Sequence, residues 1–295
     1  MATIGLVGVG LLGAAVAGRL LEAGHRVVGF DTAPDRVRAL LNMGGEAATS
    51  ARAVALAGDA VCTLLPTLAT VEAAVLGPDG VAAARKAGQV VIQMSTISPT
   101  LSARLAAESR TRGLDFLDCP VSGTSGVVAR GEGVFFVGGD RAVFERWRPL
   151  LEAMLPRAVY IGPAGQAMAL KLVANLLVAL HSAAAAEALH LARQAGLDPA
   201  LALDVLAGSA AGSRMLEVRG PLMVRGEYPA QMKLDLFMKD LHLIQEAAAI
   251  AGTALPLTDT AERLYAAAAE TGHGDEDLAV VLTALAALSP RRREA

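Results

Sequence analysis

The sequence predicts an α/β half followed by an all-helical half, and three observations lead to this prediction. Short apolar runs alternate with helix-like segments through the first half, a pattern typical of a parallel sheet covered on both faces. After Gly165 no convincing strand appears, and turn-like stretches such as GLDPA separate helical segments. Hydrophobic residues make up 54% of the chain but aromatic ones only 3%, so alanine and leucine dominate and favour helix.

The elements follow in order along the chain. A helical pattern, Leu11 to Ala23, succeeds the first apolar run, and one long helix is expected from Gly162 to Arg193. We therefore predict a doubly wound sheet domain over residues 1–162. An all-helical domain over residues 163–295 follows, beginning with the long interdomain helix. The expected strands are residues 3–9, 26–31, 60–66, 89–95, 114–122, 134–139 and 158–162.

The composition argues against several classes of protein. A net charge of −3 gives no excess of positive charge that would favour binding to nucleic acid. The basic run at 291–293 is expected to be a solvated tail. The opening MATIGLVGVG is expected to be a strand and not a signal peptide. The apolar stretch 172–186 is too short for a membrane span. Neither Cys62 nor Cys119 has metal-ligand spacing, so no metal site is expected. Two isolated cysteines are typical of a reduced protein, so we predict that it is cytoplasmic.

A glycine-rich loop follows the first strand. Gly8, Gly10 and Gly13 have the G-x-G-x-x-G spacing, a helix comes next, and Asp31 ends the second strand. Gly8 permits the tight turn, Gly10 lets the backbone approach a pyrophosphate, and Gly13 lets the helix pack closely. Asp31 can bond the ribose hydroxyls and would repel a 2′-phosphate. We predict a Rossmann-type domain that binds NAD, with NADP as the alternative.

Four motifs together resemble the β-hydroxyacid dehydrogenase family, which includes 3-hydroxyisobutyrate dehydrogenase and tartronate semialdehyde reductase. They are GLVGVGLLGAAVAGRL, DCPVSGTSG, GPAGQAMALKLVAN and FMKDLHL, spread over residues 4–243. The second and third are far more specific than the glycine loop. The resemblance implies a hydride transfer between a nicotinamide cofactor and a small β-hydroxy acid or its semialdehyde.

The resemblance also implies which residues hold the cofactor. Leu65 and Pro66 line the crevice, Thr96 lies near the nicotinamide end, and Lys239 closes over the cofactor from the helical domain with Asp240 as its neighbour. The implied cofactor-binding positions are Gly8, Gly10, Leu11, Leu12, Gly13, Asp31, Leu65, Pro66, Thr70, Thr96 and Lys239.

For the substrate, the resemblance implies that Ser122 and Gly123 present a hydroxyl and a backbone N–H to a carboxylate. Lys171 is the implied catalytic residue, and Asn175 holds the substrate beside it. The family usually reads PVSGG, whereas Thr124 replaces the second glycine here. Thr124 is expected either to add a hydroxyl contact or to shrink the pocket, which leaves the particular substrate open.

The chemistry suits Lys171. Oxidising an alcohol needs a base for the hydroxyl proton, and reducing an aldehyde needs an acid for the developing alkoxide. A desolvated lysine can perform either task. Lys171 and Asn175 are four residues apart and share one helix face, which can line an interdomain cleft. The alternative is a lysine without a catalytic role, which extends its ammonium group from the start of the helix into water.

Other side chains are expected to be structural. Cys119 should pack beneath the substrate loop rather than act as a nucleophile. Arg214 and Arg219 could meet a second anionic group, but arginines are mostly exposed and we expect both on the surface. The excess of apolar residues in the helical half predicts a homodimer or homotetramer.

Three rival functions remain to be weighed. A 6-phosphogluconate dehydrogenase is expected to have histidine just before the asparagine, where Ala174 stands, and a much longer helical C-terminus. Imine reductases typically lack lysine at the catalytic position. A non-catalytic dinucleotide-binding or chromatin-reader protein is expected to have lost the lysine, and Lys171 is present.

Overall fold

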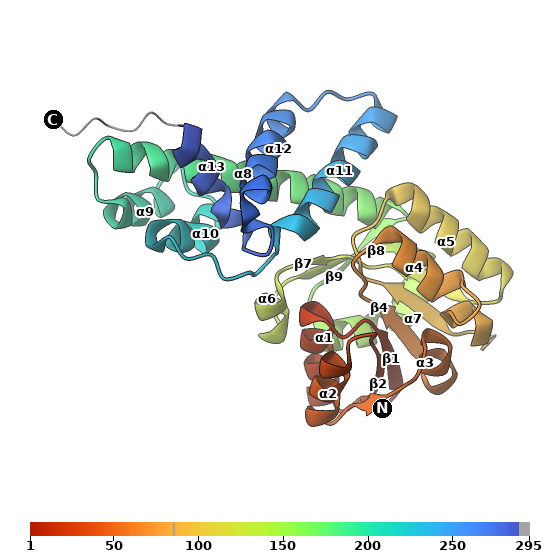
Figure 1. The fold of residues 1–295 in the computed structure, drawn as a ribbon. Helices are drawn as coiled ribbons and strands as arrows, with labels where there is room; N and C mark the ends of the chain where they lie inside the picture. Colours follow the sequence, from red (N-terminus) through yellow and green to blue (C-terminus); the bar gives the residue numbers. More distant parts are fainter. Residues whose placement is uncertain (85, 289–295) are drawn as a thin grey trace. The chain divides into compact units, whose positions relative to one another are not determined.

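The computed structural model describes residues 1–84 and 86–288 and divides into two compact units, Met1–Leu172 and Val173–Ala295 (Figure 1). The first unit contains a nine-stranded sheet in the order β3-β2-β1-β4-β5-β6-β8-β7, with β9 paired to β8. Its strands are β1 Thr3–Val7, β2 Arg26–Phe30, β3 Glu46–Ala47, β4 Ala60–Thr63, β5 Val90–Gln93, β6 Asp115–Asp118, β7 Val121–Ser122, β8 Val134–Gly139 and β9 Ala158–Gly162.

The sheet is parallel from β3 to β6, as predicted, but its far edge is mixed. Strand β8 runs antiparallel to both β6 and β7, whereas β9 runs parallel to β8. The expected strand at 114–122 is broken between β6 and β7, where Pro120 has no N–H to donate. The two-residue strand β3 was not predicted, because it is too short to show an alternating pattern.

Helices cover both faces of the sheet and bury two apolar clusters (Figure 1). One cluster joins Leu6 of β1 to Leu20 and Phe144. The other joins Val61 of β4 to Leu105. Burial of strands on both faces explains why they read as nearly continuous apolar runs. The helices of this unit are α1 Leu11–Glu22, α2 Pro34–Asn42, α3 Ala51–Ala57, α4 Leu68–Leu76, η1 Val81–Ala84, α5 Pro99–Thr111, α6 Ser125–Ala129 and α7 Arg141–Met154.

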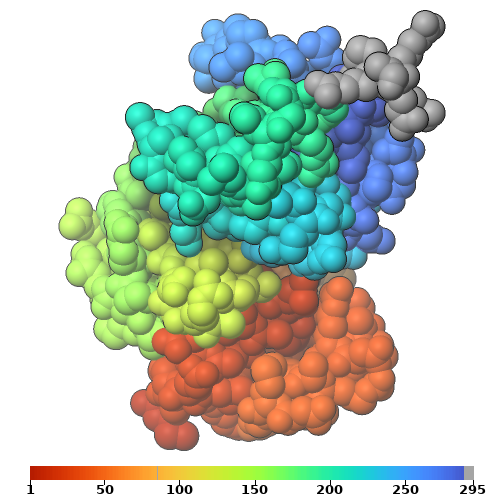
Figure 2. All heavy atoms as spheres, turned by 90° about the vertical axis from the view of Figure 1, so that its left-hand side faces the viewer, coloured from red at the N-terminus to blue at the C-terminus, as the bar shows by residue number. Residues whose placement is uncertain are grey.

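The second unit consists of helices, and the segments that it shows on the face in Figure 2, coloured from green to blue, lie against one another. The phenolic O–H of the fully buried Tyr265 donates to the carbonyl of Ala179 at 2.9 Å and so ties α12 to α8. Its helices are α8 Gln166–Gln194, which begins in the first unit, α9 Pro199–Ala207, α10 Arg214–Arg225, α11 Leu234–Ala251, α12 Pro256–Ala268, η2 Ala269–His273, η3 Leu278–Val280 and α13 Val281–Leu288.

Helix α8 is long and apolar enough to cross a membrane by length and composition alone. It also carries the buried polar residues Lys171, Asn175 and Ser182. Of its most apolar window, 44% is buried within the protein, and a single helix of this kind is weak evidence for a membrane span, because core helices pass the same test.

Candidate active site

Most of the implied site residues lie where parallel strands end. The glycine loop follows β1, Asp31 follows β2, and Leu65 follows β4. Thr96 lies beyond β5, and β6 leads through Pro120 into the segment that contains Ser122. Because β1 pairs with β2 on one side and β4 on the other, the strand order reverses at β1. A crevice at this edge is where open α/β sheets bind their ligands.

The glycine loop is as tight as its spacing predicts. Gly8 has a φ of 95°, and a Cβ there would collide with the backbone oxygen of Leu64. A Cβ at Gly13 would collide with the backbone oxygen of Gly8, so the start of α1 lies directly against the loop. Both positions therefore require glycine, one for its backbone angle and its space and the other for space alone.

The N-terminus of α1 fits a pyrophosphate. Gly10 at the start of α1 provides no side-chain cap, as is also the case for Ala33 at α2, whereas α3 and α4 are capped by Ser50 and Thr67. The first N–H groups of a helix need acceptors and carry partial positive charge. These groups can therefore bind the phosphates of a dinucleotide without displacing a protein side chain.

Asp31 is held rigidly beside the loop. Its Oδ2 accepts the backbone N–H of Val9 at 2.9 Å, and its Oδ1 accepts that of Ala33 at 2.9 Å. The guanidinium of Arg36 lies 3.4 Å from Oδ2 and is itself 57% exposed. Asp31 thus links the glycine loop to the end of β2. Arg36 places a positive charge at the same corner, a contact that sequence reasoning missed.

Two neighbouring segments have local roles that the motifs did not reveal. The N–H of Leu65 donates to Oγ of Ser95 at 2.8 Å, which fixes the turn after β4 to the end of β5. Thr70 forms a reciprocal capping box with Thr67 at the start of α4. Thr96 is half-buried beside Ser95.

The substrate segment leads into a short helix. Ser122 is half-buried in β7, and Gly123 is exposed with a φ of 156°. Thr124 is the N-cap of α6, and its Oγ1 accepts the N–H of Val127 at 3.4 Å. The residue that departs from the family pattern therefore already has a structural bond.

Lys171 and Asn175 are both buried polar residues on α8, with 9% and 3% of their surface exposed. The amide of Asn175 donates to Oδ2 of Asp240 at 2.7 Å. The ammonium of Lys239 lies 2.8 Å from Oδ1 of the same carboxylate. Asp240 therefore joins Lys239 on α11 to Asn175 on α8, a link that the motif spacing did not predict.

Asp118 is a further buried acid that the sequence analysis did not single out, although it begins the DCPVSG motif. Its Oδ2 accepts the backbone N–H of Gly165 at 3.1 Å and of Met168 at 3.2 Å. Burial raises the pKa of this carboxyl to about 6, and the backbone donors oppose that rise.

Comparison with known proteins identifies the family. Residues 3–162 match the NAD-binding domain of 6-phosphogluconate dehydrogenase, and residues 165–285 match the NAD-binding family of NADP-dependent 3-hydroxyisobutyrate dehydrogenase. The 2-hydroxy-3-oxopropionate reductase of Escherichia coli strain K12 is 34% identical, over 96% of both chains. The chain belongs to the β-hydroxyacid dehydrogenase family.

Two further relatives agree with this assignment. The NAD-dependent L-serine dehydrogenase of Pseudomonas aeruginosa is 35% identical over 95% of this chain and 97% of its own. The crystal structure of a 3-hydroxyisobutyrate dehydrogenase from Salmonella typhimurium is 35% identical over 95% of this chain and 99% of its own, with a TM-score of 0.88. The protein is an NAD(P)-dependent oxidoreductase that acts on the CH–OH group of small hydroxy acids or on the matching carbonyl.

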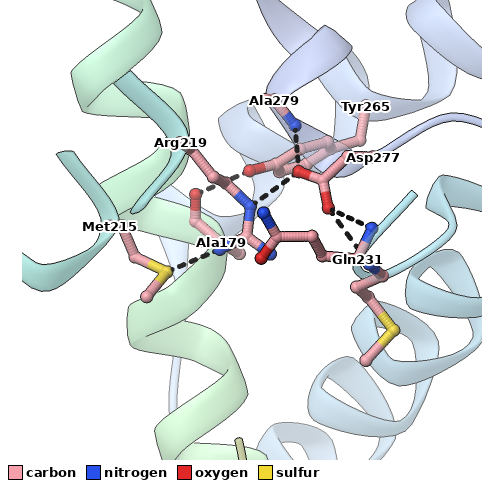
Figure 3. A network of polar contacts seen from close by, with 8 residues as sticks. Ala179, Met215, Arg219, Gln231, Tyr265, Asp277 and Ala279 are labelled. Atoms are coloured by element: carbon pink, nitrogen blue, oxygen red, sulfur yellow. Dashed lines mark hydrogen bonds and ion pairs between the residues drawn. The ribbon is translucent and has the colours of Figure 1, made fainter. Parts of the chain in front are cut away.

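Arg219 of this β-hydroxyacid dehydrogenase corrects one expectation. Arg214 is exposed as predicted, but the side chain of Arg219 is only 4% exposed, and its Nε donates to Oδ1 of Asp277 at 3.0 Å (Figure 3). Asp277 also accepts the N–H groups of Gln231 and Ala279. The expectation failed because the counter-charge lies 58 residues further along the chain, where no spacing rule can reveal it.

The two cysteines of this dehydrogenase are fully buried, as expected for Cys119. Burial raises the pKa of the Cys62 thiol to about 12 and also that of Cys119. A thiol is a poor nucleophile when it stays protonated. Within the described residues, no cluster of three His, Cys, Asp or Glu side chains could hold a metal ion.

Proposed function

We propose that this enzyme transfers a hydride between NAD(H) and a small β-hydroxy acid of the 3-hydroxyisobutyrate type, or its semialdehyde. The observation that supports this most directly is the pair Lys171 and Asn175. Two polar side chains are buried four residues apart in the stretch 167–180 of α8, whose other residues are all apolar. Both residues stand in the motif GPAGQAMALKLVAN, in which the family resemblance gives Lys171 the catalytic role and Asn175 the substrate-binding role.

In the proposed reaction, the bound nicotinamide supplies or accepts the hydride. Lys171 holds the proton at Nζ. It accepts the proton from the substrate hydroxyl during oxidation and returns it to the oxygen during reduction. As an ammonium it also stabilises negative charge on that oxygen.

Substrate orientation is assigned to three residues. The hydroxyl of Ser122 and the N–H of Gly123 donate to the carboxylate, and Asn175 holds the substrate next to Lys171. Because an amide N–H of Asn175 donates to Asp240, that bond fixes how the amide is turned. Thr124 trims the pocket while it caps α6.

For the cofactor, the glycine loop with Leu11 and Leu12 is proposed to hold the pyrophosphate, and Asp31 the adenosine ribose. NAD is proposed as the preferred cofactor because Asp31 is nearly buried, with its side chain 5% exposed, and would repel a 2′-phosphate. The remaining proposed cofactor contacts are Leu65, Pro66, Thr70, Thr96 and Lys239.

The relatives favour a small carboxylate as substrate. Their names include 2-(hydroxymethyl)glutarate, L-serine and L-threonate dehydrogenases. The test is an activity screen of β-hydroxy acids with NAD and NADP. We expect NAD-dependent oxidation of at least one acid and no turnover of cyclic imines. Imine reduction without hydroxy-acid oxidation would instead support the imine reductase alternative.

We also propose that the enzyme is cytoplasmic and forms a homodimer or homotetramer through its helical unit. The oligomer is supported by a set of exposed apolar side chains on α8 and α9. Val173, Leu191, Leu201 and Val205 are 56%, 68%, 62% and 60% exposed. A monomer in sedimentation experiments at micromolar concentration would contradict this part of the proposal.

A further inference from the structure

Asp118 caps a helix to which it is not adjacent in sequence. Helix α8 begins at Gln166, so Gly165 is its N-cap residue and Met168 is its third residue. An N-cap side chain normally accepts the N–H of the second or third residue from within the same turn. Here the acceptor is the carboxylate of Asp118, which lies 47 residues before Gly165, at the end of β6.

The fit around this carboxylate is close. Asp118 is fully buried, and a Cβ at Gly138 on the neighbouring strand β8 would collide with its Oδ1. Gly165 has a φ of 96°, and a Cβ there would lie 2.7 Å from the backbone oxygen of Pro99. Asp118 therefore binds the first turn of α8 to the end of β6 through backbone N–H groups. Gly138 and Gly165 leave the space that this contact needs.

We infer that Asp118 is a positioning residue that sets the place of Lys171 relative to the substrate segment. Lys171 follows Met168 by three residues and so lies one turn along the same side of α8. Ser122 and Gly123 follow Asp118 by four and five residues. One side chain thus ties the helix that carries the proposed acid/base to the strand that leads into the proposed carboxylate site. The inference rests on the proposed function, because it requires that Lys171 moves the proton.

The charge of Asp118 supports this role. Above its pKa of about 6 the group is a carboxylate, and a negative charge is favourable at the positive end of a helix dipole. A titratable neighbour is the buried thiol of Cys119; burial raises its pKa, and the charges of Cys62 and Asp118 add to the rise. A charged acceptor bonds backbone N–H groups more strongly than a neutral one does, and so holds the turn more rigidly.

Three variants test the inference. Asp118→Ala removes the anchor, and Asp118→Asn keeps an acceptor oxygen of similar shape. Asp140→Ala is the matched control, because Asp140 caps α7 in the same unit by accepting the N–H groups of Ala142 and Val143 at 2.7 Å and 3.3 Å. The measurements are kcat, the KM for each substrate and Tm, with Lys171→Ala assayed in parallel.

Asp118→Ala is expected to lower kcat at least about tenfold, because small misplacements of a reacting group are costly. The KM for NAD should stay unchanged. Asp118→Asn should recover most of the lost kcat, and Asp140→Ala should lower Tm while kcat stays near that of the wild type. If Asp118→Ala and Asp140→Ala lower Tm equally and both keep wild-type kcat, Asp118 is an ordinary cap and the inference is wrong.

Two further outcomes are decisive. If Asp118→Ala does not fold, Asp118→Ser is assayed in its place. Its side chain is shorter, so its hydroxyl lies further from the N–H groups at the start of α8. A wild-type kcat for Asp118→Ser would overturn the inference. If Lys171→Ala keeps normal turnover, the proposed function itself fails. If instead Lys171→Ala is inactive and Asp118→Ala is fully active, only the positioning role is lost.

Discussion

The side-chain amide of Asn175 donates a 2.7 Å hydrogen bond to the carboxylate of Asp240, and both residues are almost completely buried. This bond decides which way the amide points, because its NH₂ group is the donor. The second carboxylate oxygen lies 2.8 Å from the ammonium of Lys239. Asp240 therefore orients a proposed substrate contact without itself needing to touch the substrate.

Removing this carboxylate should weaken substrate binding. In Asp240→Ala the amide of Asn175 is free to flip, and loss of a hydrogen bond to a charged group is worth about tenfold or more in affinity. We expect the KM for the hydroxy acid to rise by about this factor. Asp240→Asn, which keeps an acceptor oxygen, should stay close to the wild type. Equal KM values for all three proteins, from initial-rate measurements, would argue against the orienting role.

Cofactor choice should depend on Asp31. Asp31→Asn removes the charge that repels a 2′-phosphate, while the guanidinium of Arg36 stays beside it. We expect the ratio of kcat/KM for NAD over NADP to fall at least about tenfold, since such a charge effect is worth more than about 1.4 kcal/mol. Asp35→Asn is the control, because Asp35 is exposed and pairs with Arg38. An unchanged ratio in Asp31→Asn, or activity of the wild type that is equal or better with NADP, would contradict the assignment.

The pocket role of Thr124 can be separated from its role as a helix cap. Thr124→Gly removes both the side-chain volume and the hydroxyl that accepts the N–H of Val127. Thr124→Ser keeps the hydroxyl and removes only the methyl group. We expect Thr124→Gly to accept bulkier β-hydroxy acids and to lose a few tenths of a kcal/mol of stability. If the substrate profile of Thr124→Gly matches the wild type, Thr124 serves only as the cap of α6.

Asp118 should make stability depend on pH in an unusual direction. Burial raises its pKa from 3.8 to about 6, so the folded state binds this proton more tightly than the unfolded state does. The contribution of Asp118 to the free energy of unfolding is therefore full below about pH 4 and is lost as pH rises through about 6, by at most about 3 kcal/mol. Because asparagine does not titrate, Asp118→Asn should not lose this part of its free energy of unfolding as pH rises. Urea unfolding of both proteins between about pH 4 and pH 7 should show the difference between them changing with pH; a constant difference would contradict the raised pKa.

How far the sequence predicts this molecule depends on the distance over which each signal acts. The glycine loop and Asp31 belong to one strand–helix–strand unit, so their spacing is set by local geometry, and the structure shows the tight turn that Gly8 and Gly13 predict. The capping role of Thr124 was also within reach, since threonine before a short helix is a cap signal.

Other features depend on contacts that spacing does not encode. Asp118 reaches the start of α8 across 47 residues, and Arg219 reaches Asp277 across 58. The reversal of β8 relative to β6 depends equally on pairing between distant segments. For Asp118 and Arg219 the polar residue was visible in the sequence, but its partner could be identified only from the folded chain.

The decisive prediction concerns Lys171. General acid–base catalysis is worth about 10²- to 10⁴-fold, and stabilisation of the alkoxide adds to it, so Lys171→Ala should lower kcat at least about 100-fold. NAD affinity should barely change, because Lys171 is not among the proposed dinucleotide contacts. Lys171→Arg should be nearly as damaging, since a guanidinium does not release its proton at working pH. Near-normal turnover of Lys171→Ala on the best substrate would show that the lysine is only a helix residue. Loss of folding, measured by circular dichroism, would make it a paired structural charge.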